Sequence, residues 1–425
     1  MSMLVPDEYL LKPENDIIPD RENDYIEVRN DNTTPPLQDT IRIHYRNTNS
    51  YINLSKSYLE IAFQINANTD THSLTNHVLS LFRRSTLKLG NITVEQVENQ
   101  NLNILVNSII KYSQDYALSS GSNSFFYRDT GDANSSRTAY VTVGAEDQVN
   151  LDYNGGYHKR LVRTSAGGIV SCRVPLGECF QIANVNKLIY GQEMEIELVQ
   201  SQNADRLFGI ATGGDLTLNE SGVNITKCSL WLNKVLPSKQ AESVFLKQIQ
   251  GNVSYDFNYL YSNCYVSSVL DVTQNTIRIS TQSENIQYAY VMCIPTAYTT
   301  GISKSRSVNN IAGANLLVDN IRFPTTKYQG LDQELGKSRC YHALSQMVNG
   351  FDASSGLSLS FDDYKRTTII PFDLRNKEQN LSGSPTQIEL EVDIVNAACR
   401  VLVILQSDRV VNMNYQGGVA VVKIN

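Results

Sequence analysis

Two stretches of this chain, about half its length apart, are built on the same plan. The first has Val-Pro-Leu at 174–176, a loop, and Met-Glu-Ile-Glu-Leu at 194–198. The second has Ile-Pro-Phe at 370–372, a loop, and Ile-Glu-Leu-Glu-Val at 388–392. Each stretch ends in strict apolar/polar alternation, which indicates a strand with one buried face and one wet face. A matching pair of strands in each half predicts one β-domain used twice.

The repeat extends to earlier segments of each half. Ile65 ends one strand-like run, and Ile294 ends a similar run 229 residues later. The same offset separates two predicted hairpins, whose turns are Gly-Asn at 90–91 and Asp-Asn at 319–320. These turn pairs suit tight two-residue connections. A constant offset across two kinds of element favours a duplicated domain.

Later in each half the offset shrinks. From Pro175 to Pro371 it is 196, and the 33-residue difference is about the size of a Ser/Gly/Asn/Asp-rich segment at 118–156. Such a segment predicts a long surface loop in the first domain. Before residue 40 the chain is polar and interrupted by proline, which indicates an extended arm. The predicted division is an N-terminal arm at 1–39, a first jelly roll at 40–235 with the long loop at 118–156, and a second jelly roll at 236–425.

The number of strand-like runs determines the predicted fold class. About eight short strands in each half favour an all-β chain of two consecutive eight-stranded jelly-roll β-sandwiches, with a few short helices in loops. A parallel α/β fold needs a helix after nearly every strand. Helical periodicity is clear only at 102–110 and weaker at 331–347. Further strands are expected at 159–163, 169–176, 194–200, 225–235, 357–361, 367–374, 388–395 and 399–405.

Charge and hydropathy exclude several classes of protein. The chain has 425 residues, a net charge of −7 and a pI near 5.4, whereas a general nucleic-acid binder is basic. We therefore expect no direct sequence-specific contact with nucleic acid. Residues 1–20 have no basic segment followed by an apolar one, and no stretch approaches the ~18 apolar residues of a membrane span. Synthesis in the cytoplasm or nucleus, without secretion, is expected.

The polar residues give no catalytic or metal signature. The histidines are His44, His72, His77, His158 and His342, and the nearest pair, His72 and His77, lies in a polar loop and lacks helical spacing. Asp362 and Asp363 precede Lys365 and Arg366, which predicts local ion pairing. Seven cysteines, at 172, 179, 228, 264, 293, 340 and 399, show no Cys-x-x-Cys spacing and are predicted to be buried free thiols.

Alternating carboxylates are the best candidates for a site. They are Glu193, Glu195 and Glu197 in the first half and Glu389, Glu391 and Asp393 in the second. Carboxylates on one face could bind Ca²⁺ or act as an acid/base pair. They are also what the wet face of a half-buried strand contains. We favour the second interpretation, and therefore predict no catalytic, cofactor-binding or metal-binding residue and no cofactor.

Tyrosine is abundant, with 23 residues against 12 Phe and the single Trp231. Tyrosine covers apolar surface while keeping a polar group, which suits large wet subunit interfaces. It also suits carbohydrate binding, although glycan-binding platforms usually draw on tryptophan.

The order of segments resembles a known family. The segments are Leu-Phe at 81–82, Leu-Lys-Leu-Gly-Asn-Ile at 87–92, Gly-Tyr-His-Lys-Arg-Leu at 156–161, Val-Pro-Leu at 174–176, Leu-Ile-Tyr-Gly at 188–191, Glu-Ile-Glu-Leu-Val-Gln-Ser at 195–201, Leu-Val-Asp-Asn-Ile at 317–321, Pro-Phe-Asp-Leu at 371–374 and the strand at 401–410. In this order they resemble the double jelly-roll major capsid proteins of the hexon-like lineage, especially those of Polinton/Maverick elements and adintoviruses. The resemblance covers most of residues 50–414, and not 1–39.

The resemblance implies a capsid protein of the virion that has no catalytic residues. It implies a homotrimer whose six jelly rolls make a pseudo-hexagonal capsomer that tiles an icosahedral shell. Its partners would be further copies of itself, neighbouring capsomers, and penton and minor capsid proteins; contact with an internal membrane stays open. The alternatives are a β-sandwich glycan-binding or receptor-binding spike protein, with loops near Trp231 or 118–156, and a glycan-active enzyme using Glu195 and Glu391.

Overall fold

The computed structural model describes residues 20–31, 34–35, 37–46, 50–65, 72–74, 77–128, 140–143, 146–149, 155–164, 168–202, 207–209, 222–251, 254–280, 285–295, 310–349, 359–375, 387–416 and 419–424. Within these ranges no helix has both the length and the apolar character that crossing a bilayer requires.

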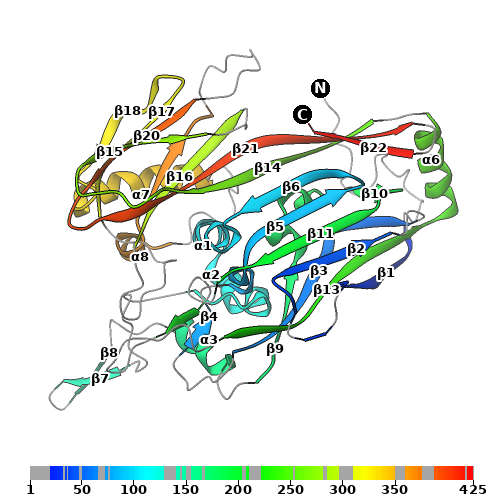
Figure 1. Cartoon of the computed structure of the whole chain (residues 1–425), viewed down its shortest axis with the longest axis horizontal. Helices are drawn as coiled ribbons and strands as arrows, with labels where there is room; N and C mark the ends of the chain where they lie inside the picture. The colour runs from blue at the N-terminus through cyan, green and yellow to red at the C-terminus, as the bar shows by residue number, and fades with distance from the viewer. Residues whose placement is uncertain are drawn as a thin grey trace.

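The first half folds into two antiparallel sheets with a shared core (Figure 1). The strands are β1 (Asp20–Arg29), β2 (Thr40–Tyr45), β3 (Tyr51–Ile65), β5 (Phe82–Leu89), β6 (Ile92–Glu98), β9 (Val170–Pro175), β10 (Leu188–Tyr190), β11 (Met194–Gln200) and β13 (Val223–Pro237). One sheet has the order β1-β13-β3-β10, with β9 also paired to β3, and the other has the order β2-β11-β5-β6. The sandwich core lies between them.

Apart from β10 and β22, the second half repeats this arrangement strand by strand. Its strands are β14 (Ser254–Val266), β15 (Gln274–Ile279), β16 (Ile286–Pro295), β17 (Ile311–Val318), β18 (Ile321–Gln329), β19 (Ile369–Asp373), β20 (Ile388–Ile394), β21 (Cys399–Gln416) and β22 (Val419–Ile424). The sheet orders are β14-β21-β16-β19, with β22 also on β21, and β15-β20-β17-β18. The order β1-β13-β3-β9 thus matches β14-β21-β16-β19, and the other two sheets match likewise. The predicted fold, a double jelly roll, is confirmed.

Local chemistry explains the two hairpins that the sequence predicts. In the turn between β17 and β18, Asp319 and Asn320 have φ angles of 51° and 66°, and Gly90 between β5 and β6 has a φ of 58°. Asp, Asn and Gly adopt this left-handed conformation most readily, so both hairpins form where expected. The alternation in β11 also places Met194, Ile196 and Leu198 in the core.

The segment predicted as an N-terminal arm, 1–39, contains a strand of the first sandwich. Residues 20–29, expected to belong to an arm at 1–39, form β1, which pairs antiparallel with β13 from Asp20–Pro237 to Arg29–Ser229. Leu37 is also buried in the first core. The first jelly roll therefore begins at β1, which is the counterpart of β14. Residues 1–19 lie outside the described residues.

Helices replace two of the predicted strands. The helices are α1 (Gln100–Lys111), α2 (Gln114–Leu118), α3 (Gly155–Thr164), α4 (Leu176–Cys179), α6 (Lys239–Gln250), α7 (Glu334–Asn349) and α8 (Phe361–Arg366), with 3-10 turns η1 (Val78–Leu81), η2 (Ser120–Ser124) and η4 (Gln181–Asn184). The strand predicted at 159–163 is part of α3, because Gly156, Arg160 and Thr164 are buried at helical spacing. Of the strand predicted at 357–361, residues 357–358 lie outside the described residues and Phe361 begins α8, which Ser360 caps by accepting the N–H of Asp363. The helices predicted at 102–110 and 331–347 are confirmed as α1 and α7.

Four short strands lie beside the sandwiches. They are β4 (His72–Leu74) paired with β12 (Leu207–Gly209), and β7 (Tyr140–Val143) paired with β8 (Glu146–Val149). The second hairpin lies in the predicted loop at 118–156. Residues 129–139, 144–145 and 150–154 of that loop are outside the described residues.

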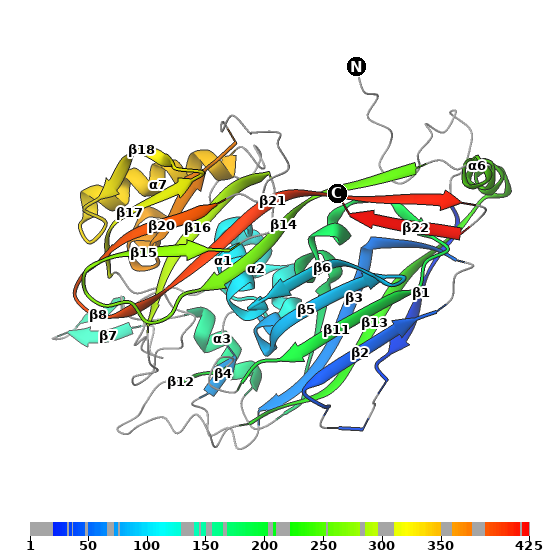
Figure 2. The ribbon, with the colours of Figure 1, turned by 45° about the horizontal axis from the view of Figure 1, so that its top comes forward.

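The two halves share their cores. In β14 and β21, Tyr255, Phe257 and Met413 pack in the core of the first half, although both strands belong to the second. In return, α1 of the first half places Leu105 and Val106 in the core of the second. Figure 2 shows β14 and β21 running along both sandwiches. The halves are therefore one interlocked unit, although the sheets of the first half contain strands up to β13 and those of the second contain strands from β14 onward.

Candidate functional sites

The alternating carboxylates of β11 are paired with cations from both neighbouring strands. Glu195 lies 3.1 Å from the Lys88 Nζ, and Glu197 lies 3.1 Å from the Arg42 Nε and 2.8 Å from an Arg84 amino group. Partial burial pushes the pKa of Glu197 up, but hydrogen bonds from Arg84 and Arg42 outweigh it and lower the pKa. These carboxylates form the wet face of a strand, as favoured from the sequence.

β20 repeats this ladder in the second half. Glu389 lies 2.9 Å from the Arg278 Nε, and Asp393 lies 2.8 Å from the Lys327 Nζ. Glu391 is the least tightly held, 3.9 Å from an Arg322 amino group. Among the described residues there is no group of three or more His, Cys, Asp or Glu side chains that could hold a metal ion. The ladders fit a structural role. Glu195 and Glu391 lie in different sandwiches, which weakens the alternative that they act as a catalytic pair.

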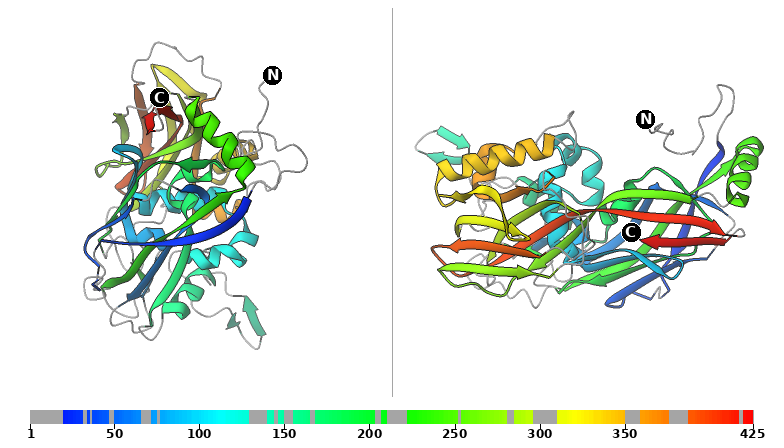
Figure 3. Two further views of the ribbon diagram at one scale, coloured as in Figure 1. Left: turned by 90° about the vertical axis from the view of Figure 1, so that its right-hand side faces the viewer. Right: turned by 90° about the horizontal axis from the view of Figure 1, so that it is seen from above.

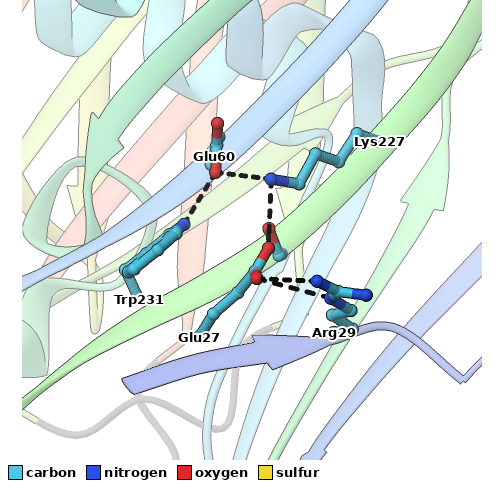
Figure 4. Close-up of polar contacts among 6 residues, drawn as sticks. Glu27, Arg29, Glu60, Lys227 and Trp231 are labelled. Carbon is cyan, nitrogen blue, oxygen red and sulfur yellow. Dashed lines mark hydrogen bonds and ion pairs between the residues drawn. The ribbon is translucent and has the colours of Figure 1, made fainter. Parts of the chain in front are cut away.

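A denser cluster lies on the outer face of the first sandwich. We call it the outer-face cluster: Tyr25, Glu27, Tyr58, Glu60, Lys227 and Trp231. The Lys227 Nζ lies 3.0 Å from Glu27 and 2.8 Å from Glu60 (Figure 4). The hydrogen bond to Glu60 is the main reason why the pKa of Lys227 is raised. Three strands that are far apart in sequence, β1, β3 and β13, are therefore tied together on this face.

Aromatic rings complete the outer-face cluster. The Trp231 indole N–H donates to Glu60 at 2.7 Å, and the Trp231 ring stacks on Tyr58 with centroids 6.0 Å apart and an interplanar angle of 12°. The ring centroids of Tyr25 and Tyr58 are 5.6 Å apart. The Arg173 guanidinium lies 5.5 Å from the centroid of the Tyr58 ring. One ring face and the N–H of Trp231 are thus already used, which weakens the case for a glycan platform at this residue.

His77, Glu178 and Tyr116 form a partly buried polar triad in the first half. His77 has no exposed surface; its Nδ1 accepts the N–H of Leu79, so its Nε2 carries the hydrogen and donates to Glu178 at 2.9 Å. Tyr116 donates to the other oxygen of Glu178. His77 and Glu178 are 101 residues apart in sequence, so this contact forms only in the fold. Each group has a hydrogen-bond partner, so the triad fits a structural role.

A second buried acid lies where the two halves meet. Glu95 on β6 has no exposed surface, and its carboxylate accepts the N–H groups of Gln181 and Ile182 at 2.9 and 3.1 Å. Burial raises the pKa of Glu95 to about 7, against the lowering effects of these two bonds and of Arg409.

Strands of the second half close over β6 beside Glu95. The Tyr259 hydroxyl donates to the Val94 carbonyl at 2.8 Å, and the Tyr261 hydroxyl to the Gln96 carbonyl at 2.5 Å. The Arg409 guanidinium donates to the Val94 carbonyl at 3.2 Å and lies 3.6 Å from the Tyr261 ring centroid. These hydrogen bonds join β14 and β21 to β6, in addition to the apolar packing of both strands in the core of the first half.

The cysteines are only partly as predicted. Cys172, Cys179, Cys228, Cys264 and Cys340 are buried free thiols. Burial raises the pKa of Cys172 and of Cys228 to about 12, so neither is a ready nucleophile. Cys293 and Cys399, also predicted to be free, form a disulfide between β16 and β21. Their spacing of 106 residues carries no sequence signal of a pair.

The comparisons concern the fold. No family model matches the sequence, and neither does any curated protein. A chain of the Sputnik virophage structure is similar over 100% of this chain and 93% of its own, with a TM-score of 0.62 and 11% identity. The mavirus major capsid protein gives a TM-score of 0.54 at 11% identity over 94% of this chain and 90% of its own. The faustovirus major capsid protein gives a TM-score of 0.53 at 10% identity, over 96% of this chain and 92% of its own. At these identities the likeness establishes the double jelly-roll fold over the whole chain.

Proposed function

We propose that this chain is a major capsid protein of a virus or virus-like element and acts without catalysis. The observation that carries the proposal is the pairing of two eight-stranded jelly rolls in one chain, with whole-length similarity to the mavirus and faustovirus major capsid proteins. The polar clusters fit this role, since they join strands to one another and carry no arrangement specific to a reaction.

The proposed assembly is a homotrimer. Two similar sandwiches in each chain let three chains present six, which gives a pseudo-hexagonal capsomer that tiles an icosahedral shell. Neighbouring capsomers, penton proteins and minor capsid proteins would be its partners, and the virion shell its location. The net charge of −7 keeps free capsomers apart and leaves neutralisation of a genome to other proteins.

The mass in solution tests the trimer. Size-exclusion chromatography with light scattering should give a particle of about three times the 47.5 kDa chain mass, and negative-stain images should show hexagonal outlines. A monomer alone at micromolar concentration would contradict the proposal. A glycan array run beside it tests the spike alternative, which requires binding that the capsid role does not.

A further inference from the structure

A helix of the first half packs against one sheet of the second sandwich. Gln406 on β21 has no exposed surface and donates to Asn107 of α1 at 3.3 Å. Asn99, just before α1, donates to the Cys264 carbonyl of β14 at 3.2 Å. Leu105 of α1 packs in the same core cluster as β14, β16 and β21. α1 thus packs against β14 and β21, two strands of this sheet.

In the matching sheet of the first sandwich, a helix packs near one end, where Phe245 of α6 lies against Tyr51 of β3 with ring centroids 5.5 Å apart. Away from α6 this sheet carries the outer-face cluster on β1, β13 and β3, the counterparts of β14, β21 and β16. Tyr25 is 43% exposed there, and Tyr58 and Trp231 are half-buried. A row of aromatic rings is therefore left partly open at the position that α1 covers in the other sandwich.

The second half also has a counterpart of α1. Both helices follow the second strand of the equivalent hairpin: α1 follows β6, and α7 follows β18. α1 is buried along most of its length, whereas α7 exposes Leu335, Arg339 and His342 along one side. Leu335 is 85% exposed, more than any other large apolar side chain in the described residues. α7 thus has an open stripe where α1 has a covered one.

We propose that α7 of one copy packs on the outer-face cluster of a second copy, repeating between chains the contact that α1 makes within the chain. The inference rests on the proposed homotrimer and names its contact surface. α7 and β1 lie toward opposite ends of the long axis, so the contact is head to tail, the type that closes rings (Figure 3).

The polar groups of the outer-face cluster are ready to be covered. Lys227 is held by two carboxylates and the Trp231 N–H by Glu60, so covering them leaves none of these groups without a partner. Tyrosine, tryptophan and arginine are also the residues enriched in interface cores. Leu335 would supply the apolar side chain that meets the rings of Tyr25 and Tyr58.

The first test substitutes the exposed leucine of α7. Leu335→Asp should keep the fold, because the side chain is 85% exposed, but should lower trimer affinity at least tenfold by light scattering. Leu118→Asp is the matched control, since Leu118 is 61% exposed on α2 and outside the proposed contact; it should leave the trimer unchanged. Circular dichroism checks that both variants are folded. A Leu335→Asp trimer as stable as the wild-type trimer would overturn the inference.

The second test identifies the contact directly. Chains with Tyr25→Cys and chains with Leu335→Cys are mixed and treated with a short bismaleimide. A cross-linked product of two chains should form in this mixture. It should not form in the control mixture of Tyr25→Cys and Leu118→Cys chains. The native free cysteines are buried and are not expected to compete. A wild-type monomer would defeat the proposed function, whereas a wild-type trimer without this cross-link would defeat the contact alone.

Discussion

Glu95 is a carboxyl group with no exposed surface, held between two backbone N–H groups of the first half and the strands that the second half lays over β6. The groups that face it are Arg409 from β21, Lys111 at the end of α1, Tyr259 and Tyr261 from β14, and Cys179 from α4. Burial raises the pKa of Glu95 from 4.5 to about 7. Between these two pH values the folded protein therefore keeps a proton on Glu95 that the unfolded chain has lost.

The sign of the pH effect follows from that proton. Between pH 4.5 and 7 the folded state binds more protons than the unfolded state, so the free energy of unfolding falls as pH rises through this window. At ~1.4 kcal/mol per pH unit, the free energy of unfolding should fall by about 3 kcal/mol across this window. Glu95→Gln should flatten the slope, measured by urea denaturation at pH 5, 6, 7 and 8.

Glu98→Gln is the control for this prediction, because Glu98 lies on the same strand and is exposed. It should retain the wild-type slope. An unchanged slope in Glu95→Gln would mean that another group carries the pH dependence.

At the scale of elements, the β17–β18 hairpin depends on two residues in left-handed conformation. Asn320 has a φ of 66°, which a β-branched residue adopts only with strain. Asn320→Val should therefore lower the free energy of unfolding by about 1–2 kcal/mol in urea titrations. Asn320→Gly also removes the side chain but permits the backbone angle, so it should stay near the wild-type value. Equal losses in both variants would show that the amide side chain, and not the angle, matters.

Elements fixed by local chemistry were predictable, and those fixed by distant partners were not. The hairpins and the alternating strands β11 and β20 carry their own turn residues and buried faces. β1 is largely polar and becomes a strand because β13, about 200 residues later, pairs with it. The outer-face cluster has the same origin, since Glu27, Glu60 and Lys227 meet only after β1, β3 and β13 align. α3 was mistaken for a strand because its short apolar run lies among basic residues.

At the scale of the whole molecule, the duplication suggests two independent domains, and the exchange of core residues contradicts that independence. Tyr255 and Met413 belong to strands of the second sandwich and to the core of the first, and Leu105 does the reverse. Separating the halves would expose apolar surface in both cores at once. Since that exposure is costly, the halves should unfold together.

Trp231, the single tryptophan, lies in the first sandwich and reports on this coupling from one half only. Leu390→Ala removes a fully buried side chain from the core of the second sandwich, and such changes cost about 2–5 kcal/mol. If the halves unfold as one unit, the urea midpoint followed by Trp231 fluorescence should fall as far as the midpoint followed by circular dichroism. Ile196→Ala, in the core of the first sandwich, is the reference for a direct effect.

Two protein concentrations separate coupling within the chain from coupling through assembly, because only the latter shifts with concentration. Independent halves would give a different result: Leu390→Ala would split the circular dichroism transition and leave the Trp231 midpoint in place. The coupled outcome fits the geometry better, because β14 and β21 cannot leave the second sandwich without also uncovering Tyr255, Phe257 and Met413 in the first.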